Sequence, residues 1–307
     1  MGDMFRRYGR VATLIICLLT AFWLAMLVVL PNITLLESSF RPLLPVTEIG
    51  GPADQYTLAN YIKVFNGSID TTLMGIPVNI PVHVLTFSLT IFYSLLVTIL
   101  CFLLTYPLAY YMAKILNPRS LPTIFLLLCV PLLVSEVLRA FAWWIILALK
   151  GPLSTLLVTL HVIDKPVRWI SGYNGVMIGL VYTYVLFMIF PVYNAMSSLD
   201  SNQIEAAEDL GSPWWRTHLR IVLPHCKPGI ASGSVMVFML SAGSLLVPTI
   251  LGSTTSQWFT QTIQQWMFDA LDWNTAAAYA FLLLLMCTLF VSLVMKLFRV
   301  KLSDIAK

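Results

Sequence analysis

The stretch LTFSLTIFYSLLVTILCFLLTYPLAYYM, residues 85–112, contains no aspartate, glutamate, lysine or arginine. A helix needs about 20 mostly apolar residues to cross the hydrocarbon core of a bilayer, because every backbone polar group must be hydrogen-bonded inside the segment. This stretch exceeds that length without a single charge. It therefore predicts a membrane-spanning helix.

The rest of the chain has a matching composition. Of its 307 residues, 59% are hydrophobic and 10% are charged, whereas soluble domains are about 45–50% apolar and about 25% charged. Five further stretches are long and apolar enough to span: 11–30, 121–148, 176–196, 229–251 and 276–297. We therefore predict an all-α membrane protein with six transmembrane helices in one domain, 1–307, with its core at about 85–300. Pro131 lies inside the third stretch, where that helix could bend.

The basic residues predict how the six helices are oriented, because lysine and arginine collect on the cytoplasmic side of the membrane. Twelve of them fall on one side: Arg6, Arg7, Arg10, Lys114, Arg119, Arg216, Arg220, Lys227, Lys296, Arg299, Lys301 and Lys307. The other side has five, spread over longer segments: Arg41, Lys63, Lys150, Lys165 and Arg168. Both termini are therefore expected in the cytoplasm. The net charge of +4 follows from this topology and does not call for a nucleic acid partner.

Two segments on the opposite side are too polar or too short to span. Residues 32–84 are expected to form an ordered external segment, with a capped short helix that begins near Thr57. Residues 152–163 are apolar but only about a dozen long, which favours an interfacial or re-entrant helix.

The most polar stretch, residues 199–228, is called the coupling loop below and lies between the fourth and fifth predicted helices. Its sequence predicts two short helices. Asp200 can cap the first helix with Gln203 as the reciprocal partner, and Gly211 can end it in the left-handed conformation. Ser212 and Pro213 suit the cap and first position of the second helix. A solvated connector is the simplest alternative interpretation.

Within this loop, EAAEDLGSPWWRTHLRIVLP at residues 205–224 resembles the signature loop of ABC importer permeases, E-A-A-x3-G-x9-I-x-L-P, at every fixed position. The matching residues are Glu205, Ala206, Ala207, Gly211, Ile221, Leu223 and Pro224. The resemblance implies a helical bundle like that of type I ABC importer permeases. It also implies that the first helix inserts into a separate ATPase subunit, with Glu205 as the charged contact, the two alanines as the packing surface and Gly211 as the turn.

The same resemblance implies a bacterial inner (plasma) membrane protein with several partners. They are two copies of a cytoplasmic ABC ATPase, a second permease chain that is related but not identical, and an external solute-binding protein that docks mainly on residues 32–84. The sequence contains no G-x-x-x-x-G-K-[ST] phosphate-binding loop. ATP and magnesium are therefore expected on the partner ATPase, and no cofactor is expected in this chain.

Other segments resemble the spermidine/putrescine permeases within that family. They are LRAFAW at 138–143, GLVYTY at 179–184, PVY at 191–193, and DWN at 272–274 followed by AAA at 276–278. Asn274 departs from the subgroup, which often has proline there. The resemblance implies that the chain forms half of a path for a polyamine, which is carried by alternating access.

A polyamine cation needs carboxylates and aromatic faces along its route. Six residues are candidates for that route: Glu136, Arg139, Trp143, Tyr184, Asp269 and Asp272. Glu136 and Arg139 lie three residues apart on one helix face, where isolated charges are costly in a membrane. Two alternatives stay open. The pair could only neutralise itself while the tryptophans form an interfacial belt, or the solute could be anionic or zwitterionic.

Two other classes of protein compete with the permease. A secondary transporter that uses Glu136 as an ion site needs no ATPase, and it leaves the capped loop unexplained. A membrane enzyme is disfavoured because the four histidines, His83, His161, His218 and His225, form no pattern with a nucleophile and a base. The five cysteines have no metal-site or disulfide spacing. We therefore expect a transport subunit with no catalytic and no metal-binding residues.

Overall fold

The structure is a computed structural model that describes residues 2–45, 48, 51–52, 54–66, 68–73, 76–253 and 255–299. It divides into two compact units: Met1–Val82 with Ile263–Leu282, and His83–Thr262 with Leu283–Lys307. The prediction of one domain stays a prediction. Lys301 and Lys307, which helped to predict the orientation, lie outside the described residues.

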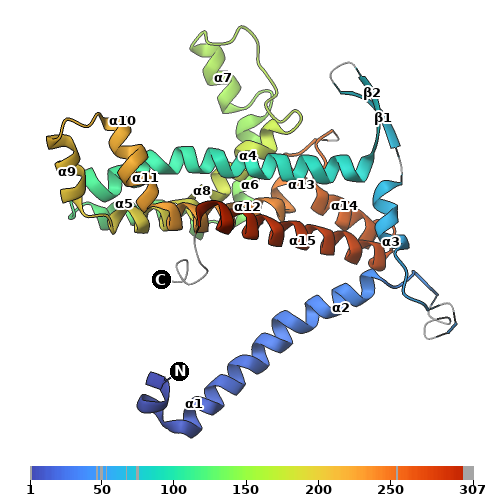
Figure 1. Ribbon diagram of the computed structural model, residues 1–307. Coiled ribbons are helices and arrows are strands. Elements are labelled where there is room, and N and C mark those ends of the chain that lie inside the picture. The colour runs from blue at the N-terminus through green and yellow to red at the C-terminus, as the bar shows by residue number, and fades with distance from the viewer. Residues whose placement is uncertain are drawn as a thin grey trace. The chain divides into compact units, whose positions relative to one another are not determined.

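The first unit begins with a long helical segment that is sharply kinked at Gly9 (φ 79°, ψ 161°) (Figure 1). It consists of α1 (Gly2–Leu24), the π-helical turn η1 (Ala25–Val29) and α2 (Leu30–Ser39). A short helix α3 (Ala59–Ile62) and a 3-10 turn η3 (Lys63–Phe65) follow. The Thr57 hydroxyl accepts a hydrogen bond from the Ala59 N–H (3.1 Å), so the predicted capped short helix is confirmed.

The first unit also contains a hairpin, which the expectation of an all-helical chain did not include. Strand β1 (Ser68–Leu73) pairs with β2 (Ile76–Pro81) antiparallel, with Ser68 opposite Pro81 and Leu73 opposite Ile76. Isoleucine, valine and threonine fill half of the positions of each strand, and these β-branched residues favour extended backbone. The hairpin falls within the predicted external segment.

The second unit contains most of the helices. They are α4 (Val82–Tyr110), η4 (Tyr111–Ile115), α5 (Leu121–Leu133), α6 (Glu136–Leu147), α7 (Pro152–Thr159), α8 (Asn174–Ser197), α9 (Ser201–Asp209), α10 (Trp214–Thr217), η5 (His218–Val222), α11 (Leu223–His225), α12 (Lys227–Ala242) and α13 (Leu246–Leu251). Three further elements follow: α14 (Phe259–Gln264), the π-helical turn η6 (Gln265–Asp269) and α15 (Trp273–Phe298). Helix α14 begins in the second unit and ends in the first, η6 belongs to the first, and α15 begins in the first and ends in the second.

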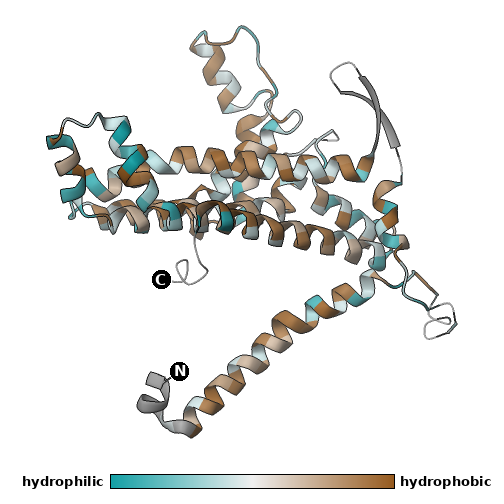
Figure 2. Ribbon diagram, viewed as in Figure 1, coloured by the Kyte–Doolittle hydropathy of each residue, from teal (hydrophilic) through white to brown (hydrophobic). Residues whose placement is uncertain are grey.

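The described helices fit the predicted number of spans. Five segments are long and apolar enough to cross a membrane: Val11–Ser39, Val82–Ile115, Glu136–Thr159, Asn174–Ser197 and Trp273–Phe298. A sixth is added if Trp214–His225 and Lys227–Ala242, which meet at a bend of 72°, form one span. Figure 2 shows that hydrophobic residues cover most of the length of these helices.

The predicted spans 121–148 and 229–251 are each interrupted. The first breaks at Val134, which is extended (ψ 135°), one turn beyond the expected bend at Pro131. The second breaks over residues 243–245. Pro248 explains the second break, since its ring clashes with the carbonyl four residues earlier, that of Ser244, and it lacks the N–H that would bond there. Helix α7 lies within 152–163, and its re-entrant position stays a prediction.

Two glycines bring α12 against α8 in the core of the second unit. A Cβ atom on Gly229 would lie 2.4 Å from the Pro191 carbonyl oxygen, and one on Gly233 would lie 2.5 Å from the Met188 sulfur. The glycines are four residues apart and so share one helix face, as in the G-x-x-x-G pattern of close membrane-helix contacts. The fully buried side chains of Val97, Leu180 and Val237 belong to the core built around this contact.

Candidate functional site

The coupling loop starts with the cap that the sequence predicts. Asp200 occupies the N-cap of α9, and its Oδ1 accepts a hydrogen bond from the Asn202 N–H (3.0 Å). The Gln203 N–H bonds to the Asp200 carbonyl (3.1 Å). In this fully described loop, the Gln203 side chain does not return the bond to the Asp200 N–H, so the reciprocal half of the predicted capping box is wrong.

Helix α9 ends at the predicted glycine. Gly211 has φ 75°, its N–H bonds to the Glu208 carbonyl (2.8 Å), and the Ser212 N–H bonds to the Ala207 carbonyl (3.0 Å). This pair of bonds is the Schellman arrangement, which satisfies the last carbonyls of a helix. Helix α10 begins one residue later than predicted, because Pro213 (φ −67°, ψ 148°) takes the extended cap position instead of the first helical one.

The outer surface of the coupling loop is largely exposed. Glu205 and Ala206 are exposed, and the nearby apolar side chains of Leu210 and Trp214 are 88% and 70% exposed. Ile204, on the opposite side of α9, is buried. An exposed cluster of large apolar side chains beside a charged residue is typical of a protein-binding surface. Figure 1 shows α9 and α10 together at one end of the helices of the second unit.

The later matched positions of the signature lie closer to the core. Ile221 and Leu223 are partly buried against the main apolar cluster, whereas Pro224 is exposed. The exposed Glu205 half of the signature is therefore free to bind a partner. The Ile221 half anchors the loop to the helices.

The coupling loop is also tied to the end of α4 by polar contacts. The Tyr106 hydroxyl and the Nδ1 atom of His218 are 2.7 Å apart and share a hydrogen bond. The Lys114 ammonium donates to the carbonyl of Leu199. Two hydrogen bonds thus hold the coupling loop to α4 and to the η4 turn that follows it.

A second polar cluster lies where the interrupted helices meet, and we call it the polar junction. Glu136 is in the first turn of α6, directly after the break at Val134, and its Oε1 accepts a hydrogen bond from the Tyr184 hydroxyl (3.2 Å). Tyr184 comes from α8 and is 6% exposed. Ser244, in the break between α12 and α13, lies beside the same hydroxyl. Two segments thus meet at the Glu136 carboxylate, and a third lies beside the Tyr184 hydroxyl that binds it.

Arg139 belongs to the polar junction but makes no close ion pair with Glu136. Both residues are described, and the Nε and Nη1 atoms of Arg139 are buried without a hydrogen-bond partner. The alternative in which the two charges only neutralise each other stays open. Buried N–H donors of a guanidinium are costly when unpaired, so this arrangement can accept an additional acceptor group.

The other predicted path residues have different surroundings. Trp143, further along α6, packs edge-on against Tyr182 (5.3 Å between ring centroids). Asp269 is exposed and belongs to the first unit, as does Asp272. Within the second unit, the structure brings Glu136, Arg139 and Tyr184 together.

Asp272 has a structural role that the sequence did not suggest. Its Oδ2 lies 2.6 Å from the Lys63 ammonium and 2.6 Å from the Thr275 hydroxyl, and its Oδ1 accepts from the Thr275 N–H (3.0 Å). The carboxylate therefore caps the start of α15 and pairs with the segment after α3. The Asn274 side chain also donates to the Pro42 carbonyl (2.9 Å). These contacts anchor the predicted external segment within the first unit.

The pKa of Asp272 reflects the same contacts. Burial alone would raise the pKa of the carboxyl group, but the hydrogen bonds from Lys63 and Thr275 outweigh burial and lower it below its ordinary value. The carboxylate is therefore charged across the physiological pH range.

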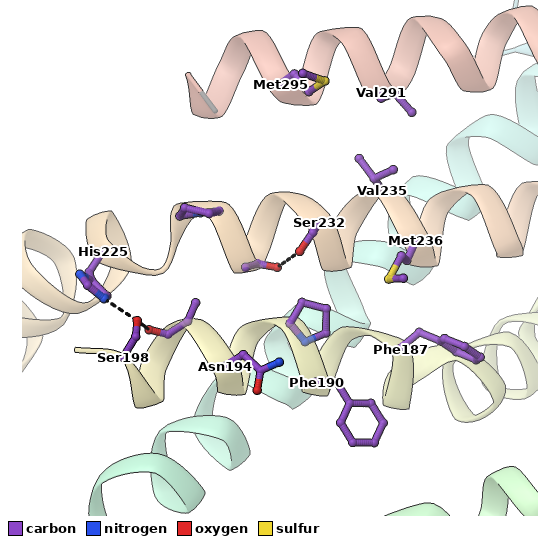
Figure 3. Close-up of a pocket in the computed structure, with 14 residues that line it drawn as sticks. Phe187, Phe190, Asn194, Ser198, His225, Ser232, Val235, Met236, Val291 and Met295 are labelled. Atoms are coloured by element: carbon purple, nitrogen blue, oxygen red, sulfur yellow. Dashed lines mark hydrogen bonds between the residues drawn. The ribbon is translucent and has the colours of Figure 1, made fainter. Parts of the chain in front are cut away.

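A groove of about 830 Å³ lies between α8, α12 and α15 of the second unit (Figure 3). Its wall is mostly apolar, with Phe187, Val235, Met236 and Met295 among the lining residues. At one end Ser198 and the Nε2 atom of His225 share a hydrogen bond (3.0 Å). None of the predicted path residues lines this groove, so it is separate from the polar junction.

Sequence reasoning missed Ser244, Lys63 and His218. Ser244 could have been found, because Pro248 marks a helix break four residues after it. Lys63 and His218 carry no local signal, since each binds a residue more than a hundred positions away. Among the described residues, no group of three His, Cys, Asp or Glu side chains is placed to hold a metal ion.

Most of the chain is similar to known proteins. Residues 101–302 match the family described as "Binding-protein-dependent transport system inner membrane component". The spermidine/putrescine transport system permease protein PotB of Salmonella typhimurium is 32% identical over 199 residues, 64% of this chain and 69% of that protein. The protein of the same name from Escherichia coli is 33% identical over 168 residues, 55% and 61% of the two chains.

More distant relatives and solved structures agree with this assignment. The inner membrane ABC transporter permease protein YdcU of Escherichia coli is 30% identical over 154 residues, 46% of this chain and 49% of that protein. A bacterial ABC transporter involved in the import of the acidic polysaccharide alginate superposes with a TM-score of 0.70 over 97% of each chain, at 15% identity. A complex of the alginate transporter with an alginate pentasaccharide-bound periplasmic protein gives a TM-score of 0.68 over 95% of this chain and 94% of that one, also at 15% identity. At this identity the likeness concerns the fold alone.

Proposed function

The chain belongs to the family of binding-protein-dependent transport system inner membrane components, and we propose that, as an ABC importer permease, it forms half of the translocation path for a polyamine. The chain hydrolyses no ATP itself. Its partners are two cytoplasmic ABC ATPase subunits that bind ATP and magnesium, a second, related permease chain and an external solute-binding protein. Both of its termini lie in the cytoplasm.

The proposal of ATP-driven import rests on the structure of the coupling loop. It has a capped helix, a Schellman turn and an outward surface formed by Glu205, Leu210 and Trp214. A connector that was exposed only to water would not need large apolar side chains on its outer surface. A secondary transporter does not need this surface either, because its energy comes from an ion gradient.

Two observations support a polyamine as the solute. Two of the relatives above are named spermidine/putrescine permeases, at 32% and 33% identity. The polar junction presents a carboxylate, Glu136, held by the Tyr184 hydroxyl (3.2 Å) at a helix interruption. An ammonium group can be bound there by charge and by acceptor oxygens.

A second solute class is favoured by one observation, the two unpaired N–H donors of Arg139. They suit a carboxylate or another acceptor on the solute. A zwitterionic or anionic solute could use Arg139 and leave Glu136 with Tyr184.

Transport by the complete importer in proteoliposomes tests the proposal. We expect ATP-dependent uptake of spermidine, and of putrescine, when both permeases, the ATPase and the binding protein are present, and none when the ATPase is omitted. Uptake by this chain alone with an ion gradient would refute the permease assignment. Substitution Glu136→Gln keeps the size of the side chain and removes its charge, so it should weaken stimulation of ATP hydrolysis by spermidine at least tenfold.

The matched substitution Arg139→Gln separates the two solute classes. If the solute is a polyamine, Arg139→Gln leaves spermidine uptake intact or improves it, because a like charge has been removed. If Arg139→Gln abolishes uptake of an acidic solute and Glu136→Gln does not, the polyamine proposal is wrong and the second class is correct.

A further inference from the structure

The bond between Tyr106 and His218 joins the coupling loop to α4 inside the second unit. The Tyr106 hydroxyl lies 2.7 Å from the His218 Nδ1 atom, and His218 is 6% exposed. The imidazole is also enclosed by the rings of Tyr110 (4.5 Å between centroids) and Trp214 (4.4 Å). Its position is therefore fixed from three directions.

Both ends of this bond lie at irregular turns of their helices. Pro107, the residue after Tyr106, interrupts the hydrogen bonding of α4, and the π-helical turn η4 (Tyr111–Ile115) follows one turn later. His218 is the first residue of another π-helical turn, η5. Prolines and π-helical turns are the usual places where helices bend, and the latter occur often at functional sites. The bond thus joins two segments that can deform.

We infer that the Tyr106–His218 bond is the contact through which a displacement of the coupling loop is passed to α4. In this role His218 and Tyr106 are positioning residues, which act by holding the coupling loop to α4. The inference rests on the proposed function, since a loop that no ATPase moves has no displacement to pass on. The exposed surface at Glu205 receives the motion, and the buried bond at His218 delivers it to a membrane-spanning helix.

The bond can be removed from either side with little change in shape. Tyr106→Phe deletes only the hydroxyl group, and His218→Leu deletes the ring nitrogens. His218→Asn is the conservative variant, because its side-chain amide can reach the position of Nδ1. Tyr111→Phe is the matched control, since it deletes a hydroxyl from an exposed ring near the same end of α4.

The decisive measurement is the number of spermidine molecules imported per ATP hydrolysed by the complete importer in proteoliposomes. Tyr106→Phe and His218→Leu should each lower this ratio about 3- to 10-fold, as expected for one hydrogen bond, while ATP hydrolysis stays within about twofold. The double variant should be no worse than the worse single one, because both remove the same contact. His218→Asn should restore the ratio, and Tyr111→Phe should not change it.

Hydrogen exchange gives a readout that does not depend on the solute. In the wild-type complex, ATP with vanadate should change the exchange of residues 103–115 and 214–222 together. In Tyr106→Phe only 214–222 should respond. If the wild type imports no spermidine but shows this paired response, the solute is wrong and the link stands.

Three results would overturn the link. The first is a wild-type transport ratio in both Tyr106→Phe and His218→Leu. The second is a fall of uptake and ATP hydrolysis in the same proportion as the amount of folded complex, which indicates a purely structural contact. The third is a paired exchange response that persists in Tyr106→Phe. If the paired response is instead missing in a wild type that imports spermidine with ATP, the link is wrong and the proposed function stands.

Discussion

Replacing Lys63 by methionine should loosen the segment after α3, and the size of the effect follows from the contacts of Asp272. The Lys63 ammonium lies 2.6 Å from the Asp272 carboxylate, and the two side chains are 33% and 6% exposed. Removing one partner of a buried ion pair costs about 3–5 kcal/mol. Because water can reach the exposed third of Lys63, we expect about 2–4 kcal/mol for Lys63→Met.

The matched substitution Asp272→Asn should cost only about 1 kcal/mol, although it breaks the same pair. Asparagine is as good an N-cap as aspartate, so the Thr275 N–H keeps an acceptor, and the Lys63 ammonium can be solvated because a third of the side chain is exposed. The double variant should therefore be more stable than Lys63→Met alone, because the buried carboxylate that lost its cation is gone.

Hydrogen exchange of residues 59–66 in the detergent-solubilised chain measures these costs, since local opening sets the exchange rate. Lys63→Met should speed exchange about 30-fold or more, and Asp272→Asn about fivefold. Residues 229–237 in the other unit are the internal control and should be unchanged. Equal effects of the two single substitutions, or a double variant worse than Lys63→Met, would refute this account of the pair.

Further substitutions test other features. Glu205→Lys should abolish transport while the subunit remains in the membrane, as measured by uptake and membrane immunoblot; normal uptake would contradict a contact with the ATPase. Gly211→Ala should cost about 1 kcal/mol in thermal unfolding, because its φ of 75° strains any residue with a Cβ atom, and an unchanged Tm would argue against the turn. Gly229→Val should destabilise more than Gly211→Ala, since a Cβ there would lie 2.4 Å from the Pro191 carbonyl; a smaller shift in Tm would mean that α8 and α12 separate easily. The pKa of Asp272 is lowered in the fold, so its contribution to stability is complete above pH of about 4 and is lost as pH falls through the folded pKa. Hydrogen exchange of residues 59–66 should therefore accelerate only below about pH 4. Acceleration between pH 5 and 8 would contradict the pairing of Asp272 with Lys63.

Local signals in the sequence predicted the features that depend on neighbouring residues. Asp200 and Gly211 bound α9 where predicted, because a cap or a left-handed turn involves only residues within one helical turn. The apolar runs located the membrane helices for the same reason. The start of α10 differed by one residue because Pro213 is suited to the cap as well as to the first helical position.

Contacts between distant parts of the chain could not be predicted in this way. Lys63 and Asp272 are 209 residues apart, and each alone looks like an ordinary charge near a membrane surface. Glu136 and Arg139 were considered a pair because they are three residues apart, yet Glu136 bonds to Tyr184 on another helix. Choosing among possible partners requires the packing of α6 against α8, which no local pattern encodes.

The two interrupted helices also have a consequence for how the protein is made. Helix α5 has 13 residues and α13 has six, both shorter than the roughly 20 that a helix needs to remain in a bilayer by itself. By length alone, we therefore expect neither to be retained in the bilayer as an independent segment during synthesis. Each should depend on the apolar helix that adjoins it in the chain, α6 for α5 and α12 for α13, to be held in the membrane.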